Sequence, residues 1–329
     1  MTLERRLGEV LDRTEEYILA RDYRGYDPYD GLMSPMWSWP GLRSWHQLRW
    51  AWQQLVKRMP VAARPLLGIK PGRNPVTLAL CLQAFGHRDA ASRSQARRER
   101  QQALVHELQS LVSPGWSGPC WGYDFNWEGR FTTTPKGFPT VVATGFVTNA
   151  CWETQQRMEL QDSADLVRES AQFVVNDLKR TVTEHGVCWS YSPKDTQAVV
   201  NASLKGVRIC AQAVSLGAPA SLLDEARPAV AHALAHQLPS GAWPYSVSDD
   251  RSWADHFHTC YVLDCLDAWV KLTGDEDARQ TIDRGWRYYR DHFFTSDGAP
   301  RYFDQKTWPV DATACGQALL TLIRFGDLE

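Results

Sequence analysis

A short aromatic turn that recurs along the chain constrains the fold more than any other feature. Each copy is followed by a segment that reads as the start of a helix, about two dozen residues after the start of the first copy and about a dozen after the start of the other three. The four copies occupy residues 120–123, 188–191, 242–245 and 300–303, and the polar residues that follow them are Thr144, Asn201, Asp255 and Asp311. The copies are spaced by roughly 55 to 70 residues, the length of a helical hairpin with its loops. A chain of 329 residues therefore has room for about six hairpins, and a ring of six encloses a central cavity.

Apolar residues recur mainly with the period of an α-helix, and strand-like alternation is scarce. Two segments have a single apolar face: residues 163–180 and residues 275–294. Ser163 is the expected N-cap of the first. Three segments are apolar around most of their circumference, which indicates helices surrounded by protein: residues 199–216, 257–272 and 313–325. This alternation predicts an all-α fold, a double-layered (α/α)6 toroid that forms one domain over residues 1–329.

The N-terminal third is less regular than the rest of the chain. Several prolines break residues 41–85 into pieces, so the first two hairpins are the least defined. Residues 114–139 form a long loop rich in Gly, Pro and aromatic residues, with no clear helix. A loop of this length in a compact domain is usually functional, and we expect it at one mouth of the toroid.

Composition excludes several classes of protein. Hydrophobic residues make up 43% and charged residues 22% of the chain, as in soluble globular proteins. No apolar run reaches about 18 residues, so no membrane span is expected, and residues 1–20 lack a signal-peptide pattern, so we expect a cytoplasmic location. A net charge of −2 gives no general attraction for nucleic acid. A surface helix is expected to begin in the basic run at residues 93–100.

Cysteine usage argues against a metal site. The eight cysteines include no C-x-x-C pair, and several lie in apolar helical stretches. We expect mostly buried free thiols, no bound metal and no cofactor.

The starts of the inner helices are where we expect chemistry, because in a toroid they all lie at one mouth. The catalytic candidates are Asp255, His258, Asp311, Tyr123 and Tyr191. The substrate-binding candidates are Tyr26, Asp27, Asp30, Trp121, Asp124, Trp127, Asn201, Trp243 and Tyr245. Simpler roles stay open for all of them: helix caps for the acids and Asn201, a core histidine, an Asp-Pro turn at residues 27–30, and a packed aromatic lid.

Two short motifs resemble those of known toroids. Residues 237–243 match Q-x-x-x-G-x-W, which recurs in terpene cyclases, where the Gln caps a helix end and stacks on the Trp, a structural role. Residues 258–261, His-Thr-Cys-Tyr, resemble protein prenyltransferase β subunits, in which this His binds zinc. The Asp and Cys that complete that zinc site are replaced here by the Val-Asn-Ala-Ser of residues 200–203. The resemblance therefore implies the toroid without the metal.

A broader resemblance covers nearly the whole chain. The segments that carry it are Tyr-Asp-Pro-Tyr-Asp-Gly-Leu at 26–32, Arg-Asn-Pro at 73–75, Cys-Trp-Gly-Tyr at 120–123, Phe-His-Thr at 257–259 and Pro-Val-Asp at 309–311. Together they look like the VpsJ-type polysaccharide biosynthesis proteins. That resemblance implies an α/α toroid and a role in glycan metabolism, and it assigns no catalytic residue.

The first functional hypothesis is a carbohydrate-active enzyme, a glycan hydrolase, lyase or epimerase. Asp255 and Asp311 would begin neighbouring inner helices, whose axes lie about 8–10 Å apart, a spacing that suits an inverting hydrolase. Helix N-termini favour ionised carboxylates, so the proton donor would be His258 or a tyrosine such as Tyr123 or Tyr191. A pair of Tyr and His would also suit a lyase or an epimerase.

Two further hypotheses stay open. An aromatic cavity could stabilise carbocations in a terpene cyclase or prenyltransferase, although the sequence has neither D-x-D-D nor D-D-x-x-D. The chain could also be a non-catalytic toroid that binds a glycan or a lipid. In each case the expected partner is a glycan or another small molecule, and the oligomeric state is left open.

Overall fold

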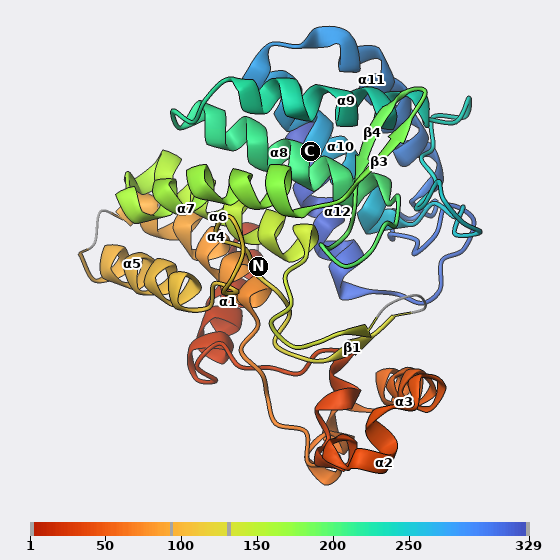
Figure 1. Cartoon of the computed structure of the whole chain (residues 1–329). Helices are drawn as coiled ribbons and strands as arrows, with labels where there is room; N and C mark the ends of the chain where they lie inside the picture. Colours follow the sequence, from red (N-terminus) through yellow and green to blue (C-terminus); the bar gives the residue numbers. More distant parts are fainter. Residues whose placement is uncertain (1–2, 93–94, 130–132, 327–329) are drawn as a thin grey trace. The chain divides into compact units, whose positions relative to one another are not determined.

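The computed structural model describes residues 3–92, 95–129 and 133–326 (Figure 1). The chain divides into two compact units, the first made of Met1–Ser113 and Trp121–Pro139, the second of Pro114–Cys120 and Thr140–Glu329. Among the described residues, no helix is both long and apolar enough to cross a membrane. A single domain over residues 1–329 stays a prediction.

The α-helices described in the second unit alternate between an inner and an outer layer. The inner helices are α6 (Val141–Met158), α8 (Val200–Ser215), α10 (His256–Thr273) and α12 (Ala312–Phe325). The outer helices are α7 (Gln161–Gln172), α9 (Ser221–Ala235) and α11 (Arg279–His292). Helix α8 packs against α6 and α10, and α10 packs against α12, while α7 and α9 cover α8 and α11 covers α10 (Figure 1). This is the alternation that the sequence predicts.

The segment predicted as one helix over residues 163–180 is more broken than expected. Helix α7 is followed by a π-helical turn, Phe173–Asp177, and then by the antiparallel hairpin of β3 (Arg180–Thr183) and β4 (Gly186–Trp189). Ser163 is not the N-cap, because α7 already begins at Gln161, and its Oγ donates to the Leu160 carbonyl at 2.6 Å. A serine inside the first turn can satisfy its hydroxyl on the backbone without capping.

Three inner helices begin at a side chain that accepts a hydrogen bond from the backbone. Thr140 accepts from Ala143 N at 3.1 Å, Asp255 from His258 N at 3.1 Å, and Asp311 from Ala314 N at 3.0 Å. The capping roles of Asp255 and Asp311 are therefore confirmed. The capping role is wrong for Asn201, because Val199 is the N-cap of α8 and Asn201 lies in its first turn. Thr144 lies near the start of α6, as expected.

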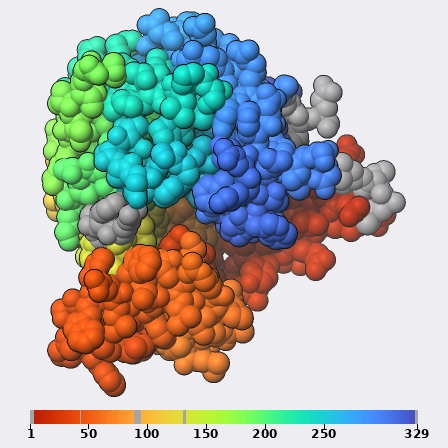
Figure 2. All heavy atoms as spheres, turned by 90° about the vertical axis from the view of Figure 1, so that its right-hand side faces the viewer, coloured from red at the N-terminus to blue at the C-terminus, as the bar shows by residue number. Residues whose placement is uncertain are grey.

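The core of the second unit surrounds α8, which is buried from Val200 to Ala213. Gly206 allows a close contact in this core, since a Cβ there would lie 2.9 Å from the Trp189 ring. In Figure 2 the side chains of this unit, coloured green to blue, form one packed body. The expectation that α12 is buried on most sides is wrong: it packs mainly against α10, and Leu319 and Ile323 are 54% and 61% exposed.

The Q-x-x-x-G-x-W motif joins the end of α9 to α11. Gln237 Nε2 donates to the carbonyls of Gly241 and Thr281 at 3.0 and 2.9 Å, and its Oε1 accepts from Arg284. The Trp243 indole donates to the Ala233 carbonyl at 2.8 Å. These contacts bear out a structural role for the motif.

The first unit is assembled from shorter pieces, as the prolines predict. Its α-helices are α1 (Leu3–Leu19), α2 (Pro40–Arg43), α3 (His46–Arg58), α4 (Pro75–Ser92) and α5 (Gln95–Ser110). Its 3-10 helices span Asp30–Met33, Pro35–Ser38, Val61–Ala63 and Pro65–Leu67, and β1 (Trp127–Glu128) pairs with β2 (Thr133–Thr134). The described part of the 114–139 loop has no helix, as expected.

Buried ion pairs hold these pieces together. Glu128, on β1, is 1% exposed and accepts from Arg49 Nε of α3 at 2.6 Å. Glu15 of α1 pairs with Arg88 of α4 and with Arg100 of α5. The predicted surface helix at residues 93–100 is thus the start of α5, partly turned inward; Arg93 and Ser94 lie outside the described residues.

Seven of the eight cysteines are buried free thiols, as predicted, and Cys315 is half-buried. Among the described residues, no three His, Cys, Asp or Glu side chains are grouped so as to hold a metal ion. The absence of a metal and of a cofactor stays a prediction.

Candidate functional site

The start of α10 carries a carboxylate and an imidazole in direct contact. Asp255 is 3% exposed, and its Oδ1 accepts from the backbone N–H of His258 while its Oδ2 lies 2.6 Å from His258 Nδ1. An ionised carboxylate can only accept, so the proton of this bond belongs to Nδ1. Nε2 is then the ring nitrogen left to act as a base. Asp255 thus caps the helix, a role that the sequence left open, and also orients the histidine, a role that was not predicted.

Aromatic rings surround this histidine. The ring centroids of Tyr245, Phe257 and Tyr261 lie 4.6, 4.3 and 5.9 Å from that of His258. Trp253 stacks on Tyr245 at 5.8 Å with an interplanar angle of 14°. We call this set, with Asp255, the α10 site. Flat apolar faces beside a base are the surroundings in which a sugar ring can be held.

A small cavity opens at the α10 site. It is lined by Asn201, Trp243, Pro244, Tyr245, Trp253, Asp255, His258, Thr259 and Val262, and has a volume of about 10 Å³, about the size of one water molecule. Asn201 is 3% exposed, and its Oδ1 has no hydrogen-bond partner. A buried acceptor without a donor is costly, so a ligand hydroxyl or a water fits at this position.

Helix α8 supplies a residue that sequence reasoning missed. Lys205 is 1% exposed, and its ammonium lies 3.9 Å from the ring centroid of Phe146 and 4.0 Å from that of Tyr261. Burial, with a contribution from the charge of Arg208, lowers the pKa of Lys205 to about 7. The signal was available: Asn201, Lys205 and Arg208 recur at helical spacing within an otherwise apolar segment.

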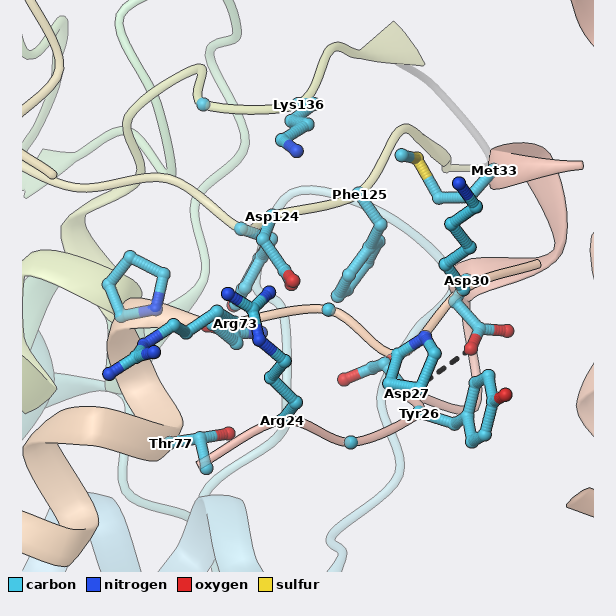
Figure 3. A pocket seen from close by; sticks show the side chains of 18 of the residues that line it. Arg24, Tyr26, Asp27, Asp30, Met33, Arg73, Thr77, Asp124, Phe125 and Lys136 are labelled. Atoms are coloured by element: carbon cyan, nitrogen blue, oxygen red, sulfur yellow. Dashed lines mark hydrogen bonds between the residues drawn. The ribbon is translucent and has the colours of Figure 1, made fainter. Parts of the chain in front are cut away.

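The first unit has a cavity of its own, with a volume of about 580 Å³ (Figure 3). Its walls come from loops and include five of the predicted residues: Tyr26, Asp27, Asp30, Tyr123 and Asp124. Its other charged and aromatic residues include Arg24, Lys70, Arg73, Phe125 and Lys136. We call it the first-unit cavity, and its volume is that of a small-molecule site.

Three carboxyl groups of this cavity are hard to ionise. Burial, reinforced by the charges of Asp30 and Asp124, raises the pKa of Asp27 to about 6. Burial also raises the pKa of Asp30, although Arg64, 3.3 Å away, opposes it. Burial likewise raises the pKa of Asp124, against the charge of Lys136. Raised pKa values favour the protonated form of these carboxyl groups, the form that can donate a hydrogen bond or act as an acid.

Two of these acids also form the predicted Asp-Pro turn. Asp27 Oδ1 accepts from Tyr29 N at 2.8 Å, and Asp30 Oδ2 accepts from Asp27 N at 3.2 Å (Figure 3). The Asp124 carboxylate packs directly against the backbone of Gly72: a Cβ on Gly72 would lie only 1.9 Å from Asp124 Oδ2. Gly72 in turn forms an antiparallel bridge with Gly25.

The remaining predicted residues have mainly structural surroundings. Trp121 is fully buried and donates to the Leu108 carbonyl at 2.7 Å, which corrects its placement as a substrate contact. Trp243 is 2% exposed, although it touches the small cavity. Trp127 lies with its ring 6.4 Å from that of Tyr29, and Tyr191 packs against the core of the second unit.

Ten of the predicted residues fall into two sets, one in each unit, and Asp311, Trp121, Trp127 and Tyr191 line neither cavity. Asp255, His258, Asn201, Trp243 and Tyr245 meet at the small cavity of the second unit, and the other set meets in the first-unit cavity. Their convergence on one mouth stays a prediction.

Comparison with known proteins places the fold. No protein-family model matches the chain, and no curated protein matches it in sequence. A cellobiose 2-epimerase from Spirochaeta thermophila DSM 6192 has a similar structure, with a TM-score of 0.57, 12% identity and coverage of 92% of this chain and 88% of that one. A D-mannose isomerase (TM-score 0.57, 12% identity) covers 77% and 71%, and a polysaccharide lyase (TM-score 0.54, 11% identity) covers 77% and 75%. These likenesses confirm the predicted fold class, the all-α toroid of helical hairpins.

Proposed function

We propose that this chain is a carbohydrate-active enzyme that moves a proton at a sugar carbon, as an epimerase or a lyase does. The observation that carries the proposal is the 2.6 Å contact between Asp255 Oδ2 and His258 Nδ1 at an aromatic cavity. This contact holds the His258 ring in place through Nδ1 and leaves Nε2 to act as the base.

The chemistry follows from the two side chains. His258 Nε2 takes the proton from the substrate, and Asp255 fixes the tautomer and stabilises the imidazolium that forms. Both oxygens of Asp255 are already engaged by His258. That engagement disfavours the hydrolytic alternative, which needs a carboxylate able to attack a sugar or activate a water. Of the three reactions first considered, epimerisation and elimination fit the site better.

Two further arguments support a carbohydrate substrate. The proteins of similar structure include a cellobiose 2-epimerase, a D-mannose isomerase and a polysaccharide lyase. The VpsJ-type resemblance points to polysaccharide metabolism, and we assign the chain to that setting in the cytoplasm. The first-unit cavity, with its tyrosines and acids, is the second place where we assign saccharide binding.

The test is exchange of carbon-bound hydrogen with solvent. The protein is incubated in D₂O with a panel of hexoses, hexuronic acids and their disaccharides, and NMR follows the loss of each C–H signal. We expect exchange in the wild type and a loss of at least about 100-fold in His258→Gln. His185→Gln, an exposed histidine on the turn between β3 and β4, is the control. Exchange that persists in His258→Gln would refute the proposal.

Two other measurements test the isoprenoid and the non-catalytic alternatives. Release of pyrophosphate from prenyl diphosphates would support the first. Saccharide binding without exchange on any member of the panel would support the second.

A further inference from the structure

Helix α8 carries two buried basic side chains without a carboxylate partner. Lys205 is 1% and Arg208 6% exposed, and among the described residues neither forms an ion pair. Arg208 donates from Nη2 to the Gly145 carbonyl at 3.0 Å, while its Nε is buried without a partner. Lys205 has only the rings of Phe146 and Tyr261 beside its ammonium.

The nearby carboxylate of Asp264 is already occupied. It accepts from Gln317 at 2.8 Å and from Thr321 at 3.2 Å, and it lies 3.4 Å from Arg324 Nε. Its charge reaches Lys205 and Arg208 without contact. Burying a charge without a hydrogen-bonded partner is strongly unfavourable, and contacts with aromatic rings return only about 0.5–2 kcal/mol each. An arrangement this costly is expected where a ligand completes it.

These basic side chains lie next to the α10 site. Tyr261 contacts both groups, with its ring centroid 4.0 Å from the Lys205 ammonium and 5.9 Å from the centroid of His258. Asn201, one turn before Lys205 on the same face of α8, lines the small cavity together with His258. Neither Lys205 nor Arg208 lines that cavity, so Tyr261 and Asn201 are the residues that connect the α10 site to the basic side chains of α8.

We propose that Lys205 and Arg208 bind the carboxylate of an acidic sugar, so that the substrate is a glycan containing uronic acid. The inference rests on the proposed function of the α10 site. A guanidinium and an ammonium three residues apart on one helix face suit the two oxygens of a carboxylate. Phe146 is half-buried whereas Tyr261 is 7% exposed, so the Phe146 ring is the one that turns aside for the ligand.

The experiment compares sugars that differ only at C6. Calorimetric titration measures the affinity for glucuronate against glucose, galacturonate against galactose, and mannuronate against mannose. We expect at least one uronate to bind at least about tenfold more tightly than its neutral partner. Lys205→Met is expected to remove that preference by weakening uronate binding much more than binding of the neutral sugar. Lys271→Met is the matched control, because this lysine is mostly exposed and paired with Asp267 at 2.9 Å.

Thermal melting separates a binding role from a structural one. Removing an unpaired buried charge relieves its desolvation, so Lys205→Met is expected to melt no lower than the wild type. A lysine that only supports packing would lower the melting temperature when replaced. Arg208→Gln, tested in the same way, is the second variant, and it too is expected to lose the preference for uronates.

The outcomes separate this inference from the proposed function. Equal affinity of the wild type for uronates and hexoses overturns the inference, as does a Lys205→Met variant that weakens both equally. Solvent exchange on neutral sugars without preference for uronates leaves the proposed function standing alone. Preferential uronate binding without exchange on any sugar leaves the carboxylate site standing and removes the proposed chemistry.

Discussion

The α10 site and the first-unit cavity hold their acids in opposite ways. At the α10 site a helix start and a histidine take both oxygens of Asp255, and helix N-termini favour negative charge. In the first-unit cavity three acids gather on loops, and burial and mutual repulsion raise the pKa of Asp27 to about 6. The first arrangement stabilises a carboxylate that directs a base, and the second disfavours the ionised form of its carboxyl groups. Aspartate therefore has different chemical properties at the two sites, because different groups surround its carboxyl group.

The largest expected effect tests whether Asp255 acts through its histidine. Asp255 and Asp311 both cap an inner helix, and asparagine caps nearly as well as aspartate. Asp255→Asn should lower turnover at least about 100-fold, because an amide does not hold the required tautomer, while Asp311→Asn should leave turnover within a few-fold. Steady-state rates with a substrate found by solvent exchange provide the measurement. A comparable loss in both variants would restore the hydrolase alternative, in which both carboxylates react.

The second effect concerns the placement of Asp124 in the first-unit cavity. A Cβ at Gly72 would meet the Asp124 carboxylate at 1.9 Å, whereas a Cβ at Gly25, its bridge partner, would meet nothing within 4 Å. Gly72→Ala should therefore displace the carboxylate and weaken saccharide binding about tenfold, the worth of one hydrogen bond to a charged group. Gly25→Ala is the matched control. Equal affinity of the two variants, measured by calorimetry, would show that Asp124 does not bind saccharide.

The third effect separates packing from chemistry in the second unit. Gln237→Ala leaves the carbonyls of Gly241 and Thr281 without their donor, so unfolding should become easier by about 1–3 kcal/mol. Turnover by the folded variant should stay unchanged, because the contacts of Gln237 join α9 to α11. Chemical denaturation gives the first quantity and initial rates give the second. A folded variant with lost turnover would place this motif in the site.

The sequence predicts those features that depend on local pattern. The aromatic turns and the alternation of helices gave the toroid, and Asp255 and His258 are three residues apart, so a helix start brings them together. The helical spacing of Lys205 and Arg208 is visible in the sequence, but their contacts with Phe146 and Gly145 on α6 depend on tertiary packing. Contacts between distant loops, such as Gly72 with Asp124, have no local signature, because backbone geometry rather than spacing determines them.

The smallest expected effect is the pH dependence of stability that Asp27 confers. Its pKa rises from an ordinary 3.8 to about 6 on folding, so the folded state disfavours its ionised form. Well below pH 3.8 both states are protonated and nothing is lost. Between about pH 4 and 6 the unfolded state ionises first, so stability falls, and above pH 6 the loss stays constant. Asp27→Asn should thus melt about 2 °C higher than the wild type at pH 7.5, with the difference vanishing well below pH 3.8. Asp297→Asn is the control of opposite sign, because hydrogen bonds from Thr295 lower the pKa of Asp297. A lower melting point for Asp27→Asn at pH 7.5 would mean that its charge stabilises the turn, and the contrast between the two sites would then be lost.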